Sequence, residues 1–535
     1  MRVSTYEMIL PLTSKDGEEI PGYKLLINGL YGAMDIVSKE DAEEIASSNL
    51  SVLSSTLIEQ FARRGHFTEK TAEEELDDLK LLARIYSKTF GRLSLGISIM
   101  PTYDCNFRCP YCYEQHRLKH GQEWLSYTIS DEMLEATFSA VKKYREKGYD
   151  VGKCNFYGGE PFLEKNLSLV KKIAEHCREL GMKMSAITNG YDLAAYIDLL
   201  DEFDFGLLQI TVDGMGEVNN RSRIHKDGYE TYERILSNIE LALSHGVTVN
   251  LRTNIVHKNL HGIKDLIDDL KARGFIDKET ERRKEEYRLK QVDPKAKTKR
   301  GEFHYYFKSA HDLQHPENNV KEQSIIEELV KYGMTVEETF MHQSCYNYPA
   351  SRLRDMLKKE TFADFDPAFC GSEKGMLKID PFGRLYSCAD FVDRKGMDVG
   401  FVDTKTGNFI FNFELAKWRT RTVDLMEKCQ TCPYCFICRG GCAASAYYQF
   451  GDWRREACEE IREIFDFIAS RVVGAHWQEH HESELSLSLL EPLSKLTKKE
   501  RETVMTSKSQ QEIFNIAKEC GLLSIKVTER NKNGA

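Results

Sequence analysis

The chain has 535 residues, which is the length of about two to four domains. Its formal net charge of −10 gives no electrostatic attraction to nucleic acid, and no apolar stretch is long enough to span a bilayer, so neither partner is expected. Fifteen cysteines without a secretory signal favour metal ligation over disulfides and predict a cytoplasmic protein.

The N-terminal segment, residues 1–92, combines strand-like and helix-like patterns. Strands followed by helices at this size resemble the winged-helix peptide-recognition element that is fused to many maturases of ribosomally made peptides. The resemblance implies a leader peptide that adds as a strand to a sheet edge. A structural cap on the next domain is the alternative. The strands are predicted at 6–12 and 23–27, and the helices near 38–47, 54–64 and 71–89.

Residues 93–335 alternate predicted strands with charged, periodic helices. This alternation is typical of a parallel sheet with right-handed crossovers, because each strand returns to the sheet through a helix. Six such units predict an α/β fold in the form of a partial (β/α)6 barrel, with a charged insertion near 277–300. The strands are expected at 93–100, 153–157, 183–188, 207–212, 248–256 and 302–309.

Three cysteines follow the first of these strands, Cys105, Cys109 and Cys112, with the spacing C-x3-C-x2-C. Three thiolates can hold three irons of a [4Fe–4S] cluster and leave the fourth iron open to a small molecule. A ferredoxin normally closes all four positions with cysteine. The spacing therefore favours chemistry at the cluster over electron storage, and a zinc knuckle is the alternative.

Unusual residues also follow the next strands, at the edge where catalytic loops gather in barrels. The second strand ends in Gly-Gly-Glu-Pro at 158–161, the third in Thr-Asn-Gly at 188–190, and the fourth in Asp-Gly at 213–214. With C-x3-C-x2-C after strand one, the Gly-Gly-Glu-Pro run resembles the radical S-adenosylmethionine (SAM) superfamily over residues 93–310. The resemblance implies that the open iron chelates SAM. The reduced cluster then cleaves SAM to methionine and a 5′-deoxyadenosyl radical, which abstracts hydrogen from the substrate.

The same resemblance makes Cys105, Cys109 and Cys112 the catalytic residues and implies further SAM contacts. Glycines let the backbone approach the methionine end, Glu160 can accept from its ammonium group, and the fork of Arg223 suits a carboxylate. For Asn189 and Asn254, simple closure of a strand end is an equal alternative. The implied SAM-binding residues are Tyr111, Gly158, Gly159, Glu160, Pro161, Asn189, Thr211, Arg223 and Asn254.

A second cysteine-rich region lies within residues 336–470 and resembles the seven-cysteine SPASM domain, which carries two auxiliary [4Fe–4S] clusters. Its central run, 429–442, has the spacing C-x2-C-x5-C-x3-C. The resemblance assigns the first auxiliary cluster to Cys370, Cys388 and Cys442, and the second to Cys429, Cys432, Cys438 and Cys458.

Two further cysteines leave alternatives open. Cys345 is the nearest upstream candidate for a fourth ligand of the first auxiliary cluster, and it can equally be free. Cys435 gives a ferredoxin-like C-x2-C-x2-C-x3-C spacing with Cys432, Cys438 and Cys442, but this reading leaves Cys429 unexplained.

The remaining cysteines and the C-terminal tail give weaker signals. Cys154, Cys177 and Cys520 are expected to be buried structural residues. The tail, 471–535, is predicted to be helical. His476 and His480 share one helical face there, which favours a solvated surface over a metal site.

Three classes of function fit these patterns. The first is a maturase that installs a thioether or carbon–carbon crosslink in a ribosomally made precursor peptide. Crosslinking after hydrogen abstraction is a net oxidation, so an electron must leave, and auxiliary clusters provide a route. A reducing partner such as flavodoxin or ferredoxin is expected.

The second class is an anaerobic sulfatase-maturing enzyme, which forms formylglycine and resembles the same pattern. In that family an Asp directly follows the second SPASM cysteine and acts as a base, whereas Ala389 follows Cys388 here and Asp390 comes one place later. The third class, a non-catalytic iron–sulfur electron carrier, is disfavoured by the open three-cysteine site. We therefore expect a peptide-modifying radical SAM oxidoreductase.

Overall fold

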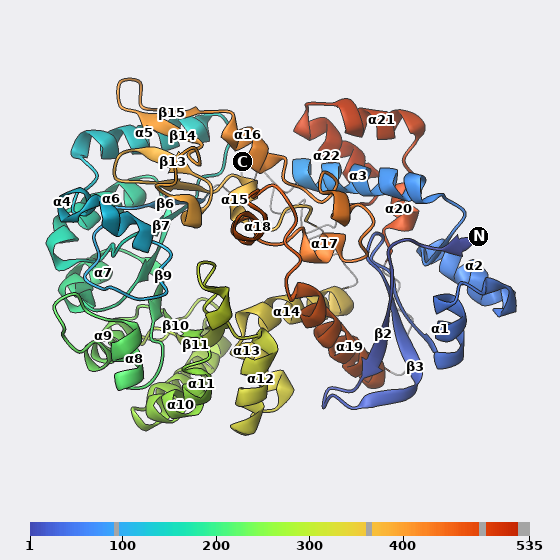
Figure 1. The fold of residues 1–535 in the computed structure, drawn as a ribbon, viewed down its shortest axis with the longest axis horizontal. Coiled ribbons are helices and arrows are strands. Elements are labelled where there is room, and N and C mark those ends of the chain that lie inside the picture. The colour runs from blue at the N-terminus through green and yellow to red at the C-terminus, as the bar shows by residue number, and fades with distance from the viewer. Residues whose placement is uncertain (90–95, 360–365, 481–487, 523–535) are drawn as a thin grey trace.

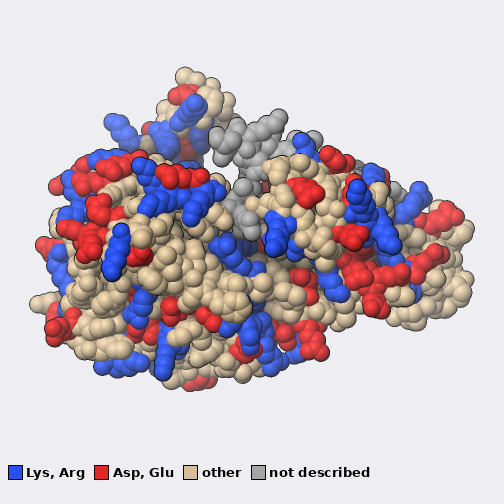
Figure 2. Space-filling view, turned by 90° about the horizontal axis from the view of Figure 1, so that it is seen from above, with Lys and Arg blue, Asp and Glu red and all other residues tan. Residues whose placement is uncertain are grey.

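The computed structural model describes residues 1–89, 96–359, 366–480 and 488–522 (Figure 1). A ten-stranded sheet and a separate three-stranded N-terminal sheet lie on opposite sides of the molecule in this view. In these ranges no helix combines the length and apolarity that a bilayer crossing requires. Basic and acidic side chains of the described residues are intermixed over the face shown in Figure 2, without a broad basic area.

Six parallel strands form the core of the large sheet and stand in sequence order along it. This arrangement confirms the predicted α/β class with a parallel sheet. Residues 93–95 of the first predicted strand lie outside the described residues. The strands are β6 (Gly96–Ile99), β7 (Lys153–Phe156), β8 (Lys183–Thr188), β9 (Phe205–Thr211), β10 (Val249–Ile255) and β11 (Phe303–Ser309).

The two faces of this sheet differ in chemistry, because successive side chains of a strand point to opposite sides. Ile97 and Cys154 point into the largest apolar core, which they share with the crossover helices. Ser98, Asn155 and Ser185 stand side by side on neighbouring strands and give the opposite face a polar character. The helices include α5 (Asp131–Glu146), α6 (Leu167–Glu179), α9 (Tyr232–Ser244), α10 (Ile263–Ala272) and α11 (Phe275–Val292).

The predicted charged insertion near 277–300 begins with α11, which is only partly exposed. Glu279 and Arg282 are buried in it and pair at 2.9 Å. Glu279 also accepts a hydrogen bond from the backbone N–H of Phe303 at 2.9 Å, which ties the helix to the start of β11.

The cysteine-rich segment extends the same sheet. Strand β12 (Leu377–Ile379) pairs in parallel with β6, and three antiparallel strands follow outward from it. They are β13 (Arg384–Tyr386), β14 (Gly400–Asp403) and β15 (Asn408–Phe411). The cysteines near β12 and β13 are thereby held beside the first parallel strand.

The N-terminal segment forms an antiparallel sheet with three following helices. His66 is fully buried between two strands, with Nδ1 2.8 Å from Glu7 Oε1 and Nε2 2.6 Å from Asp35 Oδ2. These bonds fix the end of α2 to the sheet. The strands are β2 (Glu7–Thr13), β3 (Glu19–Asn28) and β4 (Met34–Ser38), and the helices are α1 (Lys39–Ala46), α2 (Ser55–Arg64) and α3 (Ala72–Thr89).

The C-terminal helices pack on this N-terminal part rather than standing apart (Figure 1). Helix α19 (Ile461–Glu479) runs through residue 470 and packs on β2 and on α14 (Ser344–Lys359). Helices α21 (Lys498–Thr506) and α22 (Gln510–Glu519) pack against α3. Parts of the predicted tail, 481–487 and 523–535, lie outside the described residues, as does the proposed domain limit at 92/93.

Candidate active site

The three cysteines of the C-x3-C-x2-C motif lie in the loop after β6. Asp104 supports this loop by accepting a hydrogen bond from the Cys105 N–H at 2.9 Å. Burial raises the pKa of the Cys112 thiol to about 12, and the charges of Glu114 and Cys109 add to the shift. A bound positive ion would lower this pKa again, because it stabilises the thiolate form. Within the described ranges no group of three or more Cys, His, Asp or Glu side chains is arranged as a metal site. The assignment of an iron–sulfur cluster to this loop therefore rests on the presence of three cysteines in it.

The Gly-Gly-Glu-Pro loop packs directly on the cysteine loop. Gly159 has a positive φ of 51°, and a Cβ there would lie 2.3 Å from the carbonyl oxygen of Asp104. Glu160 N–H donates to that same oxygen at 2.8 Å. The close approach of the two backbones requires glycine, and it fixes the predicted SAM-binding loop against the predicted cluster loop.

Glu160 is fully buried and joins the second loop to the third. Its Oε1 accepts from Thr188 Oγ1 at 2.6 Å and from Phe162 N–H at 2.9 Å, and its Oε2 accepts from Asn189 N–H at 2.6 Å. Burial raises its pKa to about 7. Each carboxylate oxygen has two lone pairs, so Oε2 keeps capacity for one more donor. The SAM contact of Glu160 stays a prediction.

We expect Glu160→Ala to weaken SAM binding about ten- to a hundredfold, measured by equilibrium dialysis on reconstituted protein. The reason is the loss of one charge-assisted hydrogen bond, worth roughly 1.5–3 kcal/mol. Thr188→Val is the matched control, because it removes a neutral donor to Glu160 and keeps the carboxylate. Unchanged affinity in Glu160→Ala would limit Glu160 to holding the loops together.

A polar network brings three predicted residues together around Asp213. Tyr111 Oη donates to Asp213 and receives a hydrogen bond from Arg223 Nη1 at 2.9 Å. Asn254 N–H donates to Asp213 Oδ1 at 3.1 Å, and its side-chain amide lies 3.4 Å from Tyr111 Oη. Arg223 Nη1 is also 4.0 Å from Asp213 Oδ2. The network links the cysteine loop to the ends of β9 and β10.

Asp213 is not one of the site residues predicted from the sequence. Its position just after a parallel strand is nevertheless the same feature that marked the predicted ones. It comes two residues after the end of the fourth parallel strand and precedes Gly214. Thr211 is the last residue of β9 and is buried two places earlier. Burial raises the pKa of the Asp213 carboxyl, and the nearby Arg223 charge opposes this shift. Asn189 reaches the cysteine loop instead, donating to Asn106 Oδ1 at 2.7 Å.

Cys370, Cys388 and Cys442 share a neighbourhood beside β12 and β13. Burial raises the pKa of the Cys388 thiol well above its usual value, and the charges of Asp390, Cys442 and Cys370 raise it further. Asp390 Oδ2 lies 3.9 Å from Cys388 Sγ. The one-place shift of this Asp in the sequence therefore still leaves a carboxyl group beside Cys388.

Cys429, Cys432, Cys438 and Cys458 gather around a second point. Burial raises the pKa of the Cys429 thiol to about 12, with the other three thiols as further causes. Arg462 Nη2 lies 3.4 Å from Cys432 Sγ and 3.7 Å from Cys458 Sγ, where a positive charge favours thiolates.

The alternative ligands lie in different surroundings. Cys435 is buried in an apolar cluster that also contains Phe436, although Cys432 is close to it. The thiol of Cys345 points to Glu322 Oε1 at 3.5 Å. Cys154 and Cys177 are fully buried in the core of the large sheet. The ligand sets stay predictions.

Tyr157 lies between the first two cysteine groups. Its backbone N–H donates to Ile99 O at 3.1 Å, which continues the pairing of β7 with β6. Burial raises the pKa of its hydroxyl, and the charges of Asp390, Cys112 and Cys388 add to the shift. The Tyr157 hydroxyl is therefore within electrostatic range of a thiol from each of the two groups.

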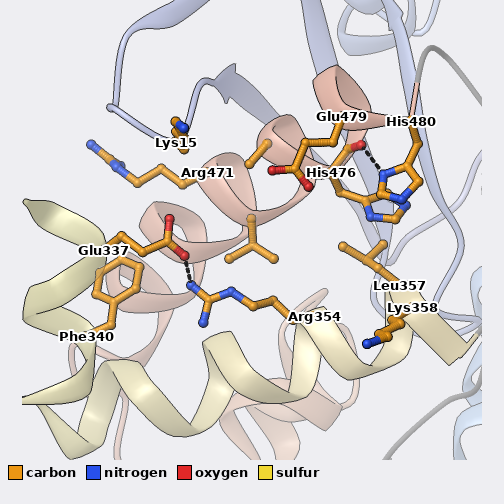
Figure 3. A pocket seen from close by; sticks show the side chains of 12 residues that line it. Lys15, Glu337, Phe340, Arg354, Leu357, Lys358, Arg471, His476, Glu479 and His480 are labelled. Carbon is orange, nitrogen blue, oxygen red and sulfur yellow. Dashed lines mark hydrogen bonds and ion pairs between the residues drawn. The ribbon is translucent and has the colours of Figure 1, made fainter. Parts of the chain in front are cut away.

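A large cavity lies elsewhere, and no cysteine is among its lining residues. It has a volume of about 690 Å³ and lies between α14, α19 and the turn that carries Lys15 (Figure 3). Its lining includes His476 and His480, whose rings stack with centroids 4.1 Å apart. His480 Nδ1 is directed at the carbonyl oxygen of His476 at 2.9 Å, so the two rings do not converge on one point.

Comparison with known proteins agrees with this geometry. The family model of the Radical SAM superfamily matches residues 99–270. The cysteine-type anaerobic sulfatase-maturating enzyme of Clostridium novyi is 23% identical over 394 residues, which cover 71% of this chain and 96% of that protein. The antilisterial bacteriocin subtilosin biosynthesis protein AlbA of Bacillus subtilis is 23% identical over 384 residues, covering 69% of this chain and 72% of AlbA.

A solved structure shows the same fold. Native anSMEcpe with bound AdoMet and Cp18Cys peptide aligns with a TM-score of 0.52 at 18% identity, covering 72% of this chain and 99% of that one. The chain spans only 57% and 50% of the length of two other curated relatives. Residues 99–270 are therefore a radical SAM domain, and the enzyme-named relatives support an enzyme, with SAM and a SAM-binding [4Fe–4S] cluster as the cofactors that the family implies.

Proposed function

We propose that the chain is a SPASM-type maturase that oxidatively modifies a ribosomally made precursor peptide, forming a thioether or carbon–carbon crosslink. The observation that supports this proposal is the pairing of β12 with β6, which places the segment that carries the first auxiliary group beside the strand that leads into the radical-site loop. Hydrogen abstraction and removal of the resulting electron can then occur close together. The similarity to AlbA, named for bacteriocin biosynthesis, agrees with a peptide substrate.

The chain's own residues have separate tasks in this proposal. Cys105, Cys109 and Cys112 would hold a cluster that, when bound, supplies the electron for SAM cleavage. Thr211 and Arg223 would hold the ribose or carboxylate groups of SAM. A reducing partner such as flavodoxin or ferredoxin would supply the electron for SAM cleavage, and two auxiliary [4Fe–4S] clusters, on the cysteine groups of Cys388 and Cys429, would take up the electron released as the product forms.

The N-terminal sheet offers one edge for a leader peptide. The strand order is β2-β3-β4, and α19 packs so closely on β2 that a Cβ at Gly474 would lie 2.0 Å from Thr13 O. Strand β4 is the other edge. Asn28 N–H donates to Ala33 O at 2.8 Å, and in an antiparallel pair inward and outward hydrogen bonding alternates. The N–H and C=O of Ile36 therefore point away from β3, where an added strand would pair with them.

The decisive test uses the peptide encoded by the short reading frame nearest to the gene for this chain. With reconstituted protein, SAM and reductant, we expect a product lighter by two hydrogen atoms, detected by mass spectrometry. Ile36→Pro should abolish most of this conversion and weaken peptide binding, because proline removes the outward N–H. SAM cleavage without peptide should remain, since the edge lies far along the chain from the cysteine loop.

Ile36→Val is the control, because it keeps the N–H and the β-branched shape. Equal peptide affinity of the Pro and Val variants would exclude β4 as the binding edge. A peptide that remains unmodified, together with conversion of a sulfatase-derived Cys peptide to formylglycine, would overturn the crosslinking proposal.

That second outcome defines the alternative function, an anaerobic sulfatase-maturing enzyme. One observation favours it: the carboxyl group of Asp390 lies beside Cys388, despite the one-place shift in sequence. The similarity to the Clostridium novyi enzyme over 96% of that protein agrees with it. The β4 edge of the N-terminal sheet favours the precursor-peptide maturase, with Arg64 donating to the outward carbonyl oxygen of Met34 at the start of that edge at 3.1 Å.

A further inference from the structure

Lys378 is a buried cation in the middle of β12. Its side chain is only 7% exposed, and it lies opposite Ser98 of β6 and Tyr386 of β13. The neighbours Leu377 and Ile379 point into the apolar core, so Lys378 points to the polar face of the sheet. An ammonium group at such a position must meet negative charge, because an isolated buried charge is strongly unfavourable.

The charges that Lys378 meets are the thiols of the first auxiliary group. Its side chain forms neither a hydrogen bond nor an ion pair with another residue in the described ranges. Burial lowers its pKa, and the nearby charges of Cys388, Cys370 and Asp390 oppose the shift. The strand pairing gives the same neighbour independently: Cys388 comes two residues after Tyr386, the partner of Lys378, which is the diagonal position on one face of an antiparallel pair.

We propose that Lys378 is a positioning residue whose ammonium group balances the thiolates of Cys370 and Cys388 and raises the reduction potential of the cluster that they hold with Cys442. The inference rests on the proposed auxiliary cluster. Reduction adds one negative charge, and a fixed positive charge nearby stabilises the reduced form more than the oxidised form. A higher potential suits a group that accepts the electron released as the product forms.

The test is a redox titration of the two auxiliary clusters, followed by electron paramagnetic resonance, in full-length reconstituted protein. The background carries Cys105→Ala, Cys109→Ala and Cys112→Ala, so that the radical-site signal is absent. We expect Lys378→Met to shift one auxiliary signal to lower potential and to leave the other at its original value. Lys378→Arg keeps the charge and should restore the potential.

Lys171→Met is the control, because Lys171 lies on the crossover helix α6, pairs there with Glu202 at 2.7 Å, and should shift neither signal. An unchanged potential in Lys378→Met at full iron content would overturn the inference and leave the maturase proposal intact. Lys378→Met could also lose one cluster. If Lys378→Arg restores that cluster, the charge role is supported, and if Lys378→Arg also lacks the cluster, the inference is overturned. Absence of any auxiliary signal in the parent protein would overturn both proposals.

Discussion

Replacing Cys105, Cys109 and Cys112 together by Ala is expected to abolish SAM cleavage. Without these thiolates the first loop has no group that binds iron, and SAM has no reduced cluster to take an electron from. Iron should fall from about twelve to about eight per chain, since each cluster contains four irons. Production of 5′-deoxyadenosine, measured by chromatography after anaerobic incubation with dithionite, should fall to background.

Cys177→Ala is the matched control for the triple variant. Cys177 is fully buried on α6 and packs in the core of the large sheet, away from the loop after β6. We expect it to keep about twelve irons and full SAM cleavage, with some loss of stability from the small cavity. Retained 5′-deoxyadenosine production in the triple variant would refute the assignment of the radical site.

The fold of the central region could be predicted because its signals are local. Alternation of strands and helices fixes a parallel sheet, and each of the six predicted strands corresponds to an observed one. The loop residues that follow these strands also come together as expected, because carboxyl ends of parallel strands meet at one edge. Tyr111, Arg223 and Asn254 illustrate this convergence around Asp213.

Other parts of the site depend on contacts that a single sequence does not encode locally. Lys378 stands in a short strand whose pairing with β6 joins segments about 280 residues apart in the chain, so its burial beside Cys388 has no sequence signal. The bonds of Glu160 to Thr188 and Asn189 likewise follow from the spatial contact of two loops. The packing of α21 and α22 on α3 is likewise a contact between segments distant in the chain, so the sequence did not predict it.

The second auxiliary group gives the other large expected effect. Cys429→Ala with Cys432→Ala should remove one cluster and stop product formation, while SAM cleavage stays detectable because the radical site is separate. The physical reason is that the product step releases an electron and the proposed route outward passes this group. Three measurements distinguish loss of one cluster from loss of the fold: the iron content, the production of 5′-deoxyadenosine and the mass of the peptide.

Cys435→Ala is the matched control, since it removes a thiol from the same run. Cys435 and Cys429 pack in the same apolar cluster, but the thiols of Cys438 and Cys458 act on the pKa of Cys429 and not on that of Cys435. We therefore expect Cys435→Ala to retain all the iron and most of the activity, with a modest loss of stability. If Cys435→Ala removes a cluster while Cys429→Ala does not, the ferredoxin-like ligand set of Cys432, Cys435, Cys438 and Cys442 replaces the assignment proposed above. The first auxiliary group would then lose Cys442 to the second and keep Cys370 and Cys388, the two thiols nearest to Lys378.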